Sequence, residues 1–264
     1  MALTTFFFLT FCLTTGAVLL LWLISIPLRD VSIIDMFFAL VLLAVACLSF
    51  SLAPHQGSLQ YLLLSMVLAW SLRMSAHLIP RNWGHGEDAR YTRLRNWVDD
   101  DRAFIWLSLR QVFLLQGVII WLVSLPLQVG MYSTAEPGIL AAFGALIWLI
   151  GLLCETIADW QLTRFRANPA LRGTVLKTGL WRYSRHPNYF GELCVWWGIF
   201  LVACEAPWGF FTVVGPLAYS YLVVNVTGQR TLDKKLAREK PGYQQYMDST
   251  SGLIPLPPRK QAPG

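Results

Sequence analysis

The chain has 264 residues, of which 55% are hydrophobic and only 14% are charged, and its formal net charge is +6. With a mean hydropathy of +0.50 and 12 tryptophans, this composition excludes an ordinary soluble globular domain and predicts an all-α integral membrane protein with a single membrane domain. The five cysteines lie in apolar segments without paired or metal-ligand spacing, so we expect reduced thiols and no metal site.

Seven membrane spans are predicted from windows of about 20 apolar residues. They cover residues 2–27, 33–53, 58–79, 103–126, 137–158, 190–205 and 208–226. The first lacks a basic leader and a cleavage site, so we expect it to be retained as a span. Lys and Arg concentrate in 73–110, 164–185 and 230–260, which share one face of the membrane if there are seven spans. Because basic loops stay in the cytosol, we expect the N-terminus outside and the C-terminus inside.

The positive charge is therefore read mainly as a topology signal, and we expect no nucleic-acid partner. A basic cytosolic face would also attract anionic lipid or a phosphorylated cofactor. The expected location is a bacterial inner membrane, or the endoplasmic reticulum of a eukaryote.

Polar residues in the third span form one stripe. Trp70, Arg73 and His77 are spaced at i, i+3 and i+7, which places them on one helix face. Arg73 lies about a turn and a half from the cytosolic end, so it either snorkels to the surface or faces a polar cavity. In the second span, Asp35 is expected at the level of the lipid headgroups.

The segment 80–102 is longer than a simple connection between two spans requires. Glu87, Asp88, Arg90 and Tyr91 follow one another closely and alternate in charge. The segment is either a solvated loop or a lid over the cytosolic mouth of the bundle, and this density of polar groups favours the lid.

A second stripe ends the fifth span, where Glu155, Asp159 and Arg166 continue from membrane depth into a cytosolic loop. The two carboxylates either form a structural network with local arginines or bind the hydrogen-bond donors of a ligand. The loop that follows is strongly cationic and has no acid before Glu192. Its basic residues are Arg164, Arg166, Arg172, Lys177, Arg182 and Arg185. Unpaired cations in this number suit phosphate groups.

The densest polar stretch is 177–198, KTGLWRYSRHPNYFGELCVWWG. Pro187 is well placed for the first turn of the sixth span, which puts Asn188 and Glu192 at i and i+4 on one helix face with Tyr189 beside them. An amide and a carboxylate presented together can orient a planar group that has both donors and acceptors, such as a carboxamide.

An amphipathic cytosolic helix is predicted after the seventh span. It begins with Arg230, Asp233 and Lys234, and Tyr243 follows it. If the basic side of this helix returns to the cytosolic mouth, it closes a phosphate site from below.

The stretch TGLWRYSRHPNYFGELCVWWG resembles the C-terminal region of the membrane steroid 5α-reductases and their bacterial relatives, and more distantly the sterol reductases. The similarity is carried by Asn188, Tyr189, Phe190, Gly191 and Glu192, by Asp159 with Arg166 seven residues later, by the turn Lys177-Thr-Gly-Leu-Trp181, and by the spacing of Trp70 and Arg73. It covers about 155–255 well and the first half of the chain in outline.

This resemblance implies a seven-helix bundle that binds NADPH in its cytosolic half and reduces an activated C=C bond of a steroid, sterol or other hydrophobic lipid. Residues 1–136 would form the lipid-substrate side and residues 137–258 the cofactor-binding region. Together, the charge pattern and this resemblance predict the following cofactor-binding residues: Glu155, Asp159, Arg166, Lys177, Arg182, Arg185, His186, Asn188, Tyr189, Glu192, Arg230, Asp233, Lys234 and Tyr243.

The catalytic residues are less well defined, because this sequence departs from the 5α-reductase pattern. Its second span has no internal Glu, and Trp70 stands where the family has a Tyr. The candidate proton donors are therefore Tyr91, His77 or a water held by Arg73, with Glu192 beside the nicotinamide.

Two other classes of protein remain. Isoprenylcysteine carboxyl methyltransferases carry a similar RHPxYxG segment and bind S-adenosylmethionine, which has no phosphate and little use for six basic residues between 164 and 185. A non-enzymatic membrane scaffold leaves the clustered polar residues without a ligand. We therefore favour the reductase.

Overall fold

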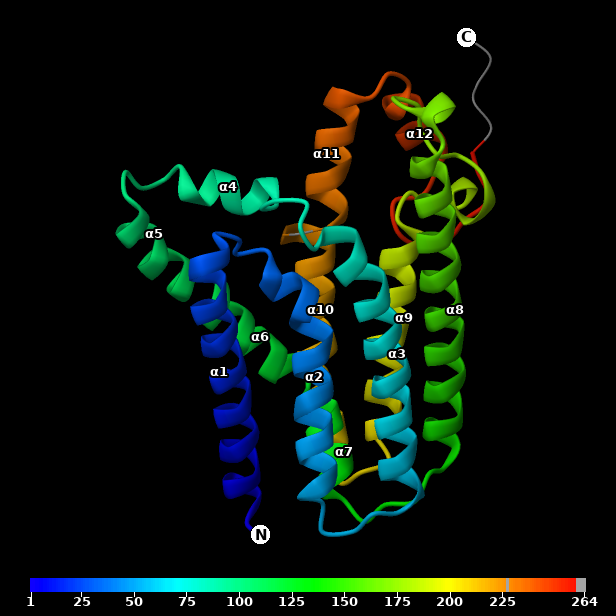
Figure 1. Ribbon diagram of the computed structural model, residues 1–264. Helices are drawn as coiled ribbons and strands as arrows, with labels where there is room; N and C mark the ends of the chain where they lie inside the picture. Colours follow the sequence, from blue (N-terminus) through cyan, green and yellow to red (C-terminus); the bar gives the residue numbers. More distant parts are fainter. Residues whose placement is uncertain (227, 260–264) are drawn as a thin grey trace. The chain divides into compact units, whose positions relative to one another are not determined.

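The computed structural model describes residues 1–226 and 228–259, and within these ranges its regular structure is helical, with one isolated β-bridge between Ser184 and Ser251. The α-helices are α1 (Leu3–Leu28), α2 (Ile33–Ser51), α3 (Ser58–Asn82), α4 (Ala89–Arg95), α5 (Asp101–Ser108), α6 (Leu115–Val123), α7 (Leu125–Tyr132), α8 (Ile139–Ala167), α9 (Pro187–Ala203), α10 (Val214–Tyr221), α11 (Gln229–Glu239) and α12 (Tyr243–Ser249) (Figure 1). The predicted all-α class is confirmed.

Six helical runs among the described residues are long and apolar enough to cross a membrane. They are Leu3–Leu28, Ile33–Ser51, Ser58–Asn82, Asp101–Val123, Ile139–Ala167 and Gly209–Glu239. The chain is therefore a multi-pass membrane protein by the length and composition of its helices. The predicted sixth span corresponds to α9, which has 17 residues. A seventh crossing and the orientation of the chain stay predictions.

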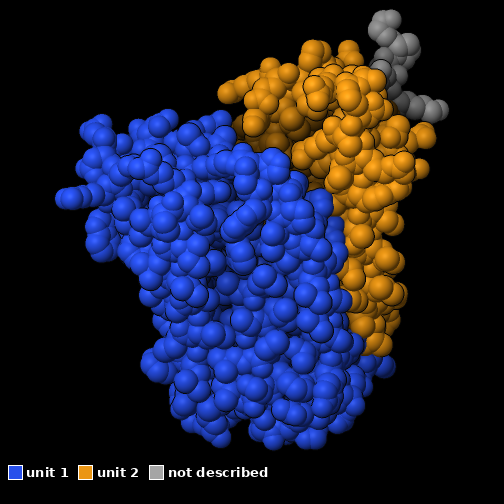
Figure 2. Space-filling model, in the orientation of Figure 1, with its two compact units in different colours: residues 1–141, 202–215 blue, residues 142–201, 216–264 orange. Residues whose placement is uncertain are grey.

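Two compact units make up the chain, and Figure 2 shows each in its own colour. Unit 1 comprises Met1–Ala141 and Val202–Gly215, and unit 2 comprises Ala142–Leu201 and Pro216–Gly264. The two units are defined by packing alone. The division into a lipid-substrate side before residue 137 and a cofactor-binding region after it therefore stays a prediction.

Buried polar side chains tie the helices of unit 1 together. Thr10 on α1 donates to Gln128 Oε1 on α7 at 2.6 Å, and Gln128 Nε2 donates to Ser124 Oγ at 2.7 Å. Gln60 on α3 donates to the backbone oxygen of Ser133 at 2.6 Å. Around these bonds α2 packs closely against α3 and α1. Hydrogen bonds of this kind hold apolar helices in one register where lipid supplies no hydrophobic drive between them.

The predicted fourth span, 103–126, is not one uninterrupted α-helix. A π-helical turn over Leu109–Leu114 separates α5 from α6, and the separate helix α7 lies partly in the predicted outer loop. Pro126 explains the additional helix, because its fixed φ and missing N–H suit the first turn of α7.

The segment between α3 and α5 is folded against the loop that precedes α2. Glu87 accepts from the backbone N–H of Val31 at 3.1 Å and from Arg95 Nη2 at 2.9 Å, while the backbone N–H of Asp88 donates to Ser32 Oγ at 2.7 Å. The side chain of Asp88 also caps α4 by accepting from the backbone N–H of Arg90. A segment held by these bonds is not a freely solvated loop, which excludes that alternative. Its role as a lid stays a prediction.

In unit 2, glycines let α8 and α9 approach until their backbones touch, and the two helices lie side by side in Figure 1. A Cβ on Gly191 would lie 2.5 Å from the backbone nitrogen of Glu155 and 2.6 Å from the backbone oxygen of Gly151. A Cβ on Gly198 would lie 2.6 Å from the backbone oxygen of Gly144. Small residues at such crossings are typical of helix pairs in membranes.

Candidate functional site

Helix α9 begins at Pro187, a residue that suits the first turn of a helix. The polar face of α9 therefore begins with the next residue, Asn188. Asn188 Nδ2 donates to Asp159 Oδ1 on α8 at 3.1 Å. Its Oδ1 atom is buried and has no hydrogen-bond partner among the described residues. An acceptor left in this state is unfavourable in the protein alone and suits the N–H of a ligand.

Glu192 lies one turn further along this face and accepts a hydrogen bond from the phenol of Tyr219, on α10. Glu155 on α8 is almost fully buried, with 1% of its surface exposed, and its backbone lies against Gly191. The close contact of α8 with α9 thus gathers Glu155, Asp159, Asn188 and Glu192 in one unit. Sequence reasoning missed Tyr219, because a single Tyr in an apolar span carries no signal until its partner on another helix is known.

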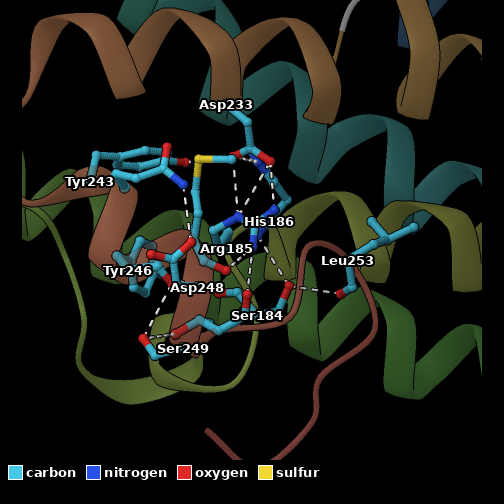
Figure 3. A network of polar contacts seen from close by, with 12 residues as sticks. Ser184, Arg185, His186, Asp233, Tyr243, Tyr246, Asp248, Ser249 and Leu253 are labelled. Carbon is cyan, nitrogen blue, oxygen red and sulfur yellow. Dashed lines mark hydrogen bonds and ion pairs between the residues drawn. The ribbon is translucent and has the colours of Figure 1, made fainter. Parts of the chain in front are cut away.

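Arg185 and His186 form a buried network with Asp233, which comes from α11 (Figure 3). Arg185 Nη2 lies 2.8 Å from Asp233 Oδ2, and His186 Nε2 lies 2.9 Å from Asp233 Oδ1. Tyr243 donates to the same carboxylate at 2.7 Å. Burial and this hydrogen bond raise the pKa of Tyr243, so its phenol keeps its proton and remains a donor.

Within this network the guanidinium of Arg185 binds acceptors of its own chain. Besides Asp233, it donates to the backbone oxygens of Met247 and Thr250 near the end of α12. Arg185, His186, Asp233 and Tyr243 therefore join the start of α9 to α11 and α12. No pattern in the sequence indicates these contacts, because Arg185 and Asp233 are 48 positions apart in the chain. A phosphate contact of Arg185 stays a prediction.

A cavity of about 100 Å³ lies beside this network. Its walls include the apolar side chains of Leu162, Phe165 and Trp181 and the polar side chains of Arg166, His186 and Tyr243. Lys240 also lines it and donates to the backbone oxygen of Thr174 at 2.9 Å. The structure thus places the predicted residue Arg166 near the network formed by His186 and Tyr243.

A second, open depression of about 420 Å³ contains two more of the predicted cations, Lys177 and Arg182. Ser249 and Thr250 add hydroxyl groups to its wall. The Lys177 ammonium lies 5.9 Å from the centre of the Tyr246 ring, and in the described part of the chain neither cation forms an ion pair with an acid. Such a surface suits a phosphate group.

Other predicted cofactor residues take different positions. The ring of Tyr189 stacks on His186, with 5.3 Å between ring centroids. Arg230 and Lys234 are exposed on α11, whereas Asp233 on the same helix is buried. Arg230 and Lys234 line neither the cavity nor the depression.

The predicted proton donor Tyr91 belongs to a polar cluster in unit 1. Its phenol donates to Asp35 Oδ1 at 3.0 Å and accepts from Gln116 Nε2 at 3.1 Å, and Arg90 lies 2.7 Å from Asp35 Oδ2. Burial and the charge of Asp35 raise the pKa of Tyr91, so the phenol stays protonated. Asp35 is the hub of this cluster, a role the sequence did not reveal because its partners come from α4 and α6.

The stripe on α3 also lies in unit 1. Trp70 is fully buried and Arg73 and His77 are half-buried, with His77 Nε2 3.4 Å from Arg81 Nη1. Tyr91, Arg73 and His77 thus lie in one unit and Glu192 in the other. Their action as one catalytic set stays a prediction.

Residues 21–250 match the model of a protein family described as protein of unknown function (DUF1295). The chain belongs to this DUF1295 family. An uncharacterised protein of Schizosaccharomyces pombe is 24% identical to it, over 89% of this chain and 75% of the relative. No solved structure matches.

The part of the chain that matches the DUF1295 family contains both polar clusters, from Asp35 in unit 1 to Tyr243 in unit 2. The family description assigns no activity. The chemistry of these clusters must therefore be argued from their own geometry.

Proposed function

We propose that this DUF1295 protein is a membrane-bound, NADPH-dependent reductase of an activated C=C bond in a steroid, sterol or other hydrophobic lipid. The observation that carries the proposal is the buried Asn188 Oδ1, which has no hydrogen-bond partner among the described residues. An unsatisfied buried acceptor costs about 1–3 kcal/mol, so a ligand that donates an N–H to it gains that amount on binding. The carboxamide of nicotinamide has such an N–H.

Other residues of unit 2 suit the phosphate groups of this cofactor. Lys177 and Arg182 present cations, and Ser249 and Thr250 hydroxyls, in an open depression that suits phosphate groups. Arg166 adds a further cation at the smaller cavity. NADPH, when bound, supplies the hydride for the β-carbon of the substrate double bond.

In this proposal, residues of the chain position the cofactor and supply the proton for the substrate. The phenol of Tyr219 fixes the carboxyl group of Glu192, and Asp159 fixes the amide of Asn188, so the polar face of α9 is oriented before a ligand arrives. The donor that we propose for the α-carbon is the phenol of Tyr91, which, like any tyrosine, carries its proton at neutral pH.

A specific observation also favours a second candidate, an S-adenosylmethionine-dependent methyltransferase. Glu155, Asp159 and Glu192 gather carboxylates around α8 and α9, which suits a sulfonium cation, and Arg185 is occupied by its own chain. We rank this candidate second, because a cofactor without phosphate leaves Lys177 and Arg182 without a partner.

NADPH is expected to raise the melting temperature of the detergent-purified protein. A ligand at 100 times its Kd adds about 2.7 kcal/mol to folding, which corresponds to roughly 5 °C or more in a chain of this size. S-adenosylmethionine at the same concentration is the matched comparison and is expected to give no shift. A shift with S-adenosylmethionine alone reverses the ranking of the two functions.

Replacing Asn188 with Ala is expected to weaken NADPH binding about 10- to 100-fold while leaving the protein folded. The side chain already carries an unsatisfied acceptor, so its removal offsets part of the lost bond to Asp159, whereas the ligand loses its partner. Titration of intrinsic fluorescence measures the Kd. Asn225→Ala is the control, because the half-buried Asn225 amide donates within its own helical turn, to the backbone oxygen of Tyr221; equal Kd values for the two variants contradict the role of Asn188.

A further inference from the structure

Helix α11 carries a basic face that the proposed cofactor site does not use. Arg230, Lys234, Lys235 and Arg238 are all exposed, and three of them, at i, i+4 and i+8, form one stripe along the helix. Asp233 faces the other way, into the buried network with Arg185 and His186. Because that network fixes the rotation of α11, the basic face cannot turn inward.

Among the described residues, no acid pairs with these four cations. In the described part of the protein none of them forms an ion pair or a side-chain hydrogen bond. The two acids of α11 do not compensate them, since Asp233 is held by Arg185 and His186, and Glu239 forms no ion pair there. The face therefore keeps a net positive charge.

The position of α11 in the chain places this charge at the end of an apolar helical run. The helical run Gly209–Glu239 is long and apolar enough to cross a bilayer, and α11 is its last and polar part, continuing in the direction of α10 (Figure 1). With a rise of 1.5 Å per residue, Arg230 and Lys234 are about 6 Å apart along the axis. This spacing matches a headgroup layer of roughly 5–8 Å on each side of the hydrocarbon core.

We propose that the basic face of α11 binds the anionic headgroups of phospholipids in the leaflet from which the helix emerges. Arg230 and Lys234 contact lipid phosphates directly, and Lys235 and Arg238 add attraction over the distance at which charges act in physiological salt. This gives Arg230 and Lys234 a partner other than the cofactor suggested by the sequence. The inference does not rest on the proposed reductase activity.

The test uses the full chain in nanodiscs of phosphatidylcholine with a minor fraction of spin-labelled phosphatidylglycerol. Electron spin resonance measures the association of this lipid relative to spin-labelled phosphatidylcholine, without any cofactor. The wild type is expected to prefer phosphatidylglycerol, and high salt is expected to abolish the preference. Arg230→Gln with Lys234→Gln is expected to lower it by roughly five-fold for each cation removed.

The matched control is Arg93→Gln with Arg102→Gln, which removes two exposed cations of unit 1. It is expected to keep the wild-type preference. Three results overturn the proposal. The first is a wild-type preference for phosphatidylglycerol that is absent or insensitive to salt, and the second is an unchanged preference in the α11 variant. The third is a loss of preference in the control that equals the loss in the α11 variant. A normal melting temperature of the α11 variant shows that it is folded.

Discussion

Asp233→Asn is expected to lower the free energy of unfolding by about 3–5 kcal/mol, because it breaks a buried ion pair by removing one partner only. The side chains of Asp233, Arg185 and His186 are 6%, 11% and 2% exposed, so little water is available to replace the lost charge. The amide also has only one acceptor oxygen, whereas the carboxylate receives bonds from Arg185, His186 and Tyr243. Thermal unfolding in detergent measures the loss.

Asp248→Asn is the control for this substitution. Asp248 lies on the neighbouring helix α12, is exposed and accepts from Gln244 at 3.0 Å. Its loss is expected to change stability by less than about 0.5 kcal/mol. If both variants unfold at the wild-type temperature, Asp233 does not hold α11 and α12 to the start of α9.

The segment from Arg185 to Gly191 shows how several structural roles fit into one short motif. Arg185 and His186 bind Asp233, and Pro187 starts α9. Asn188 faces α8, and Gly191 allows the backbones of the two helices to touch. Among these residues, only Asn188 contacts a ligand in the function that we propose. The basic residues of this motif therefore contribute less to a phosphate site than their number in the sequence suggests.

The sequence predicted the features that depend on local composition. Apolar windows located the long helices, and the i, i+4 spacing placed Asn188 and Glu192 on one face of α9. It did not predict partners on other helices, such as Tyr219 for Glu192 or Asp233 for Arg185. Such pairs depend on helix rotation and on loop conformation, and neither leaves a periodic signal in the chain.

Local composition does not show which cations have partners within the chain. Six cations between 164 and 185 suggested a uniform phosphate-binding field. The structure places four of them in three different settings: Arg185 is bound inside the protein, Arg166 lines the small cavity, and Lys177 and Arg182 line the open depression. The proposed phosphate site therefore rests mainly on the last two.

Gly191→Ala is expected to destabilise the protein by up to about 3 kcal/mol and to weaken NADPH binding as well. The new Cβ would lie 2.5 Å from the backbone nitrogen of Glu155 and 2.6 Å from the backbone oxygen of Gly151. Backbone atoms in packed helices cannot move aside as a flexible side chain does, so α9 must shift away from α8. That shift separates Asn188 from Asp159 and disturbs the polar face that we assign to the ligand.

The effect can be separated from the helix propensity of the new residue by the same substitution at Gly16, on α1. A Cβ there meets nothing within 4 Å, so Gly16→Ala is expected to be neutral or to stabilise by up to about 1 kcal/mol. Melting temperature and NADPH affinity are measured on both variants. Equal stability of the two would mean that α8 and α9 tolerate separation, and the close approach would then not be what brings Glu155 and Asp159 to the polar face of α9.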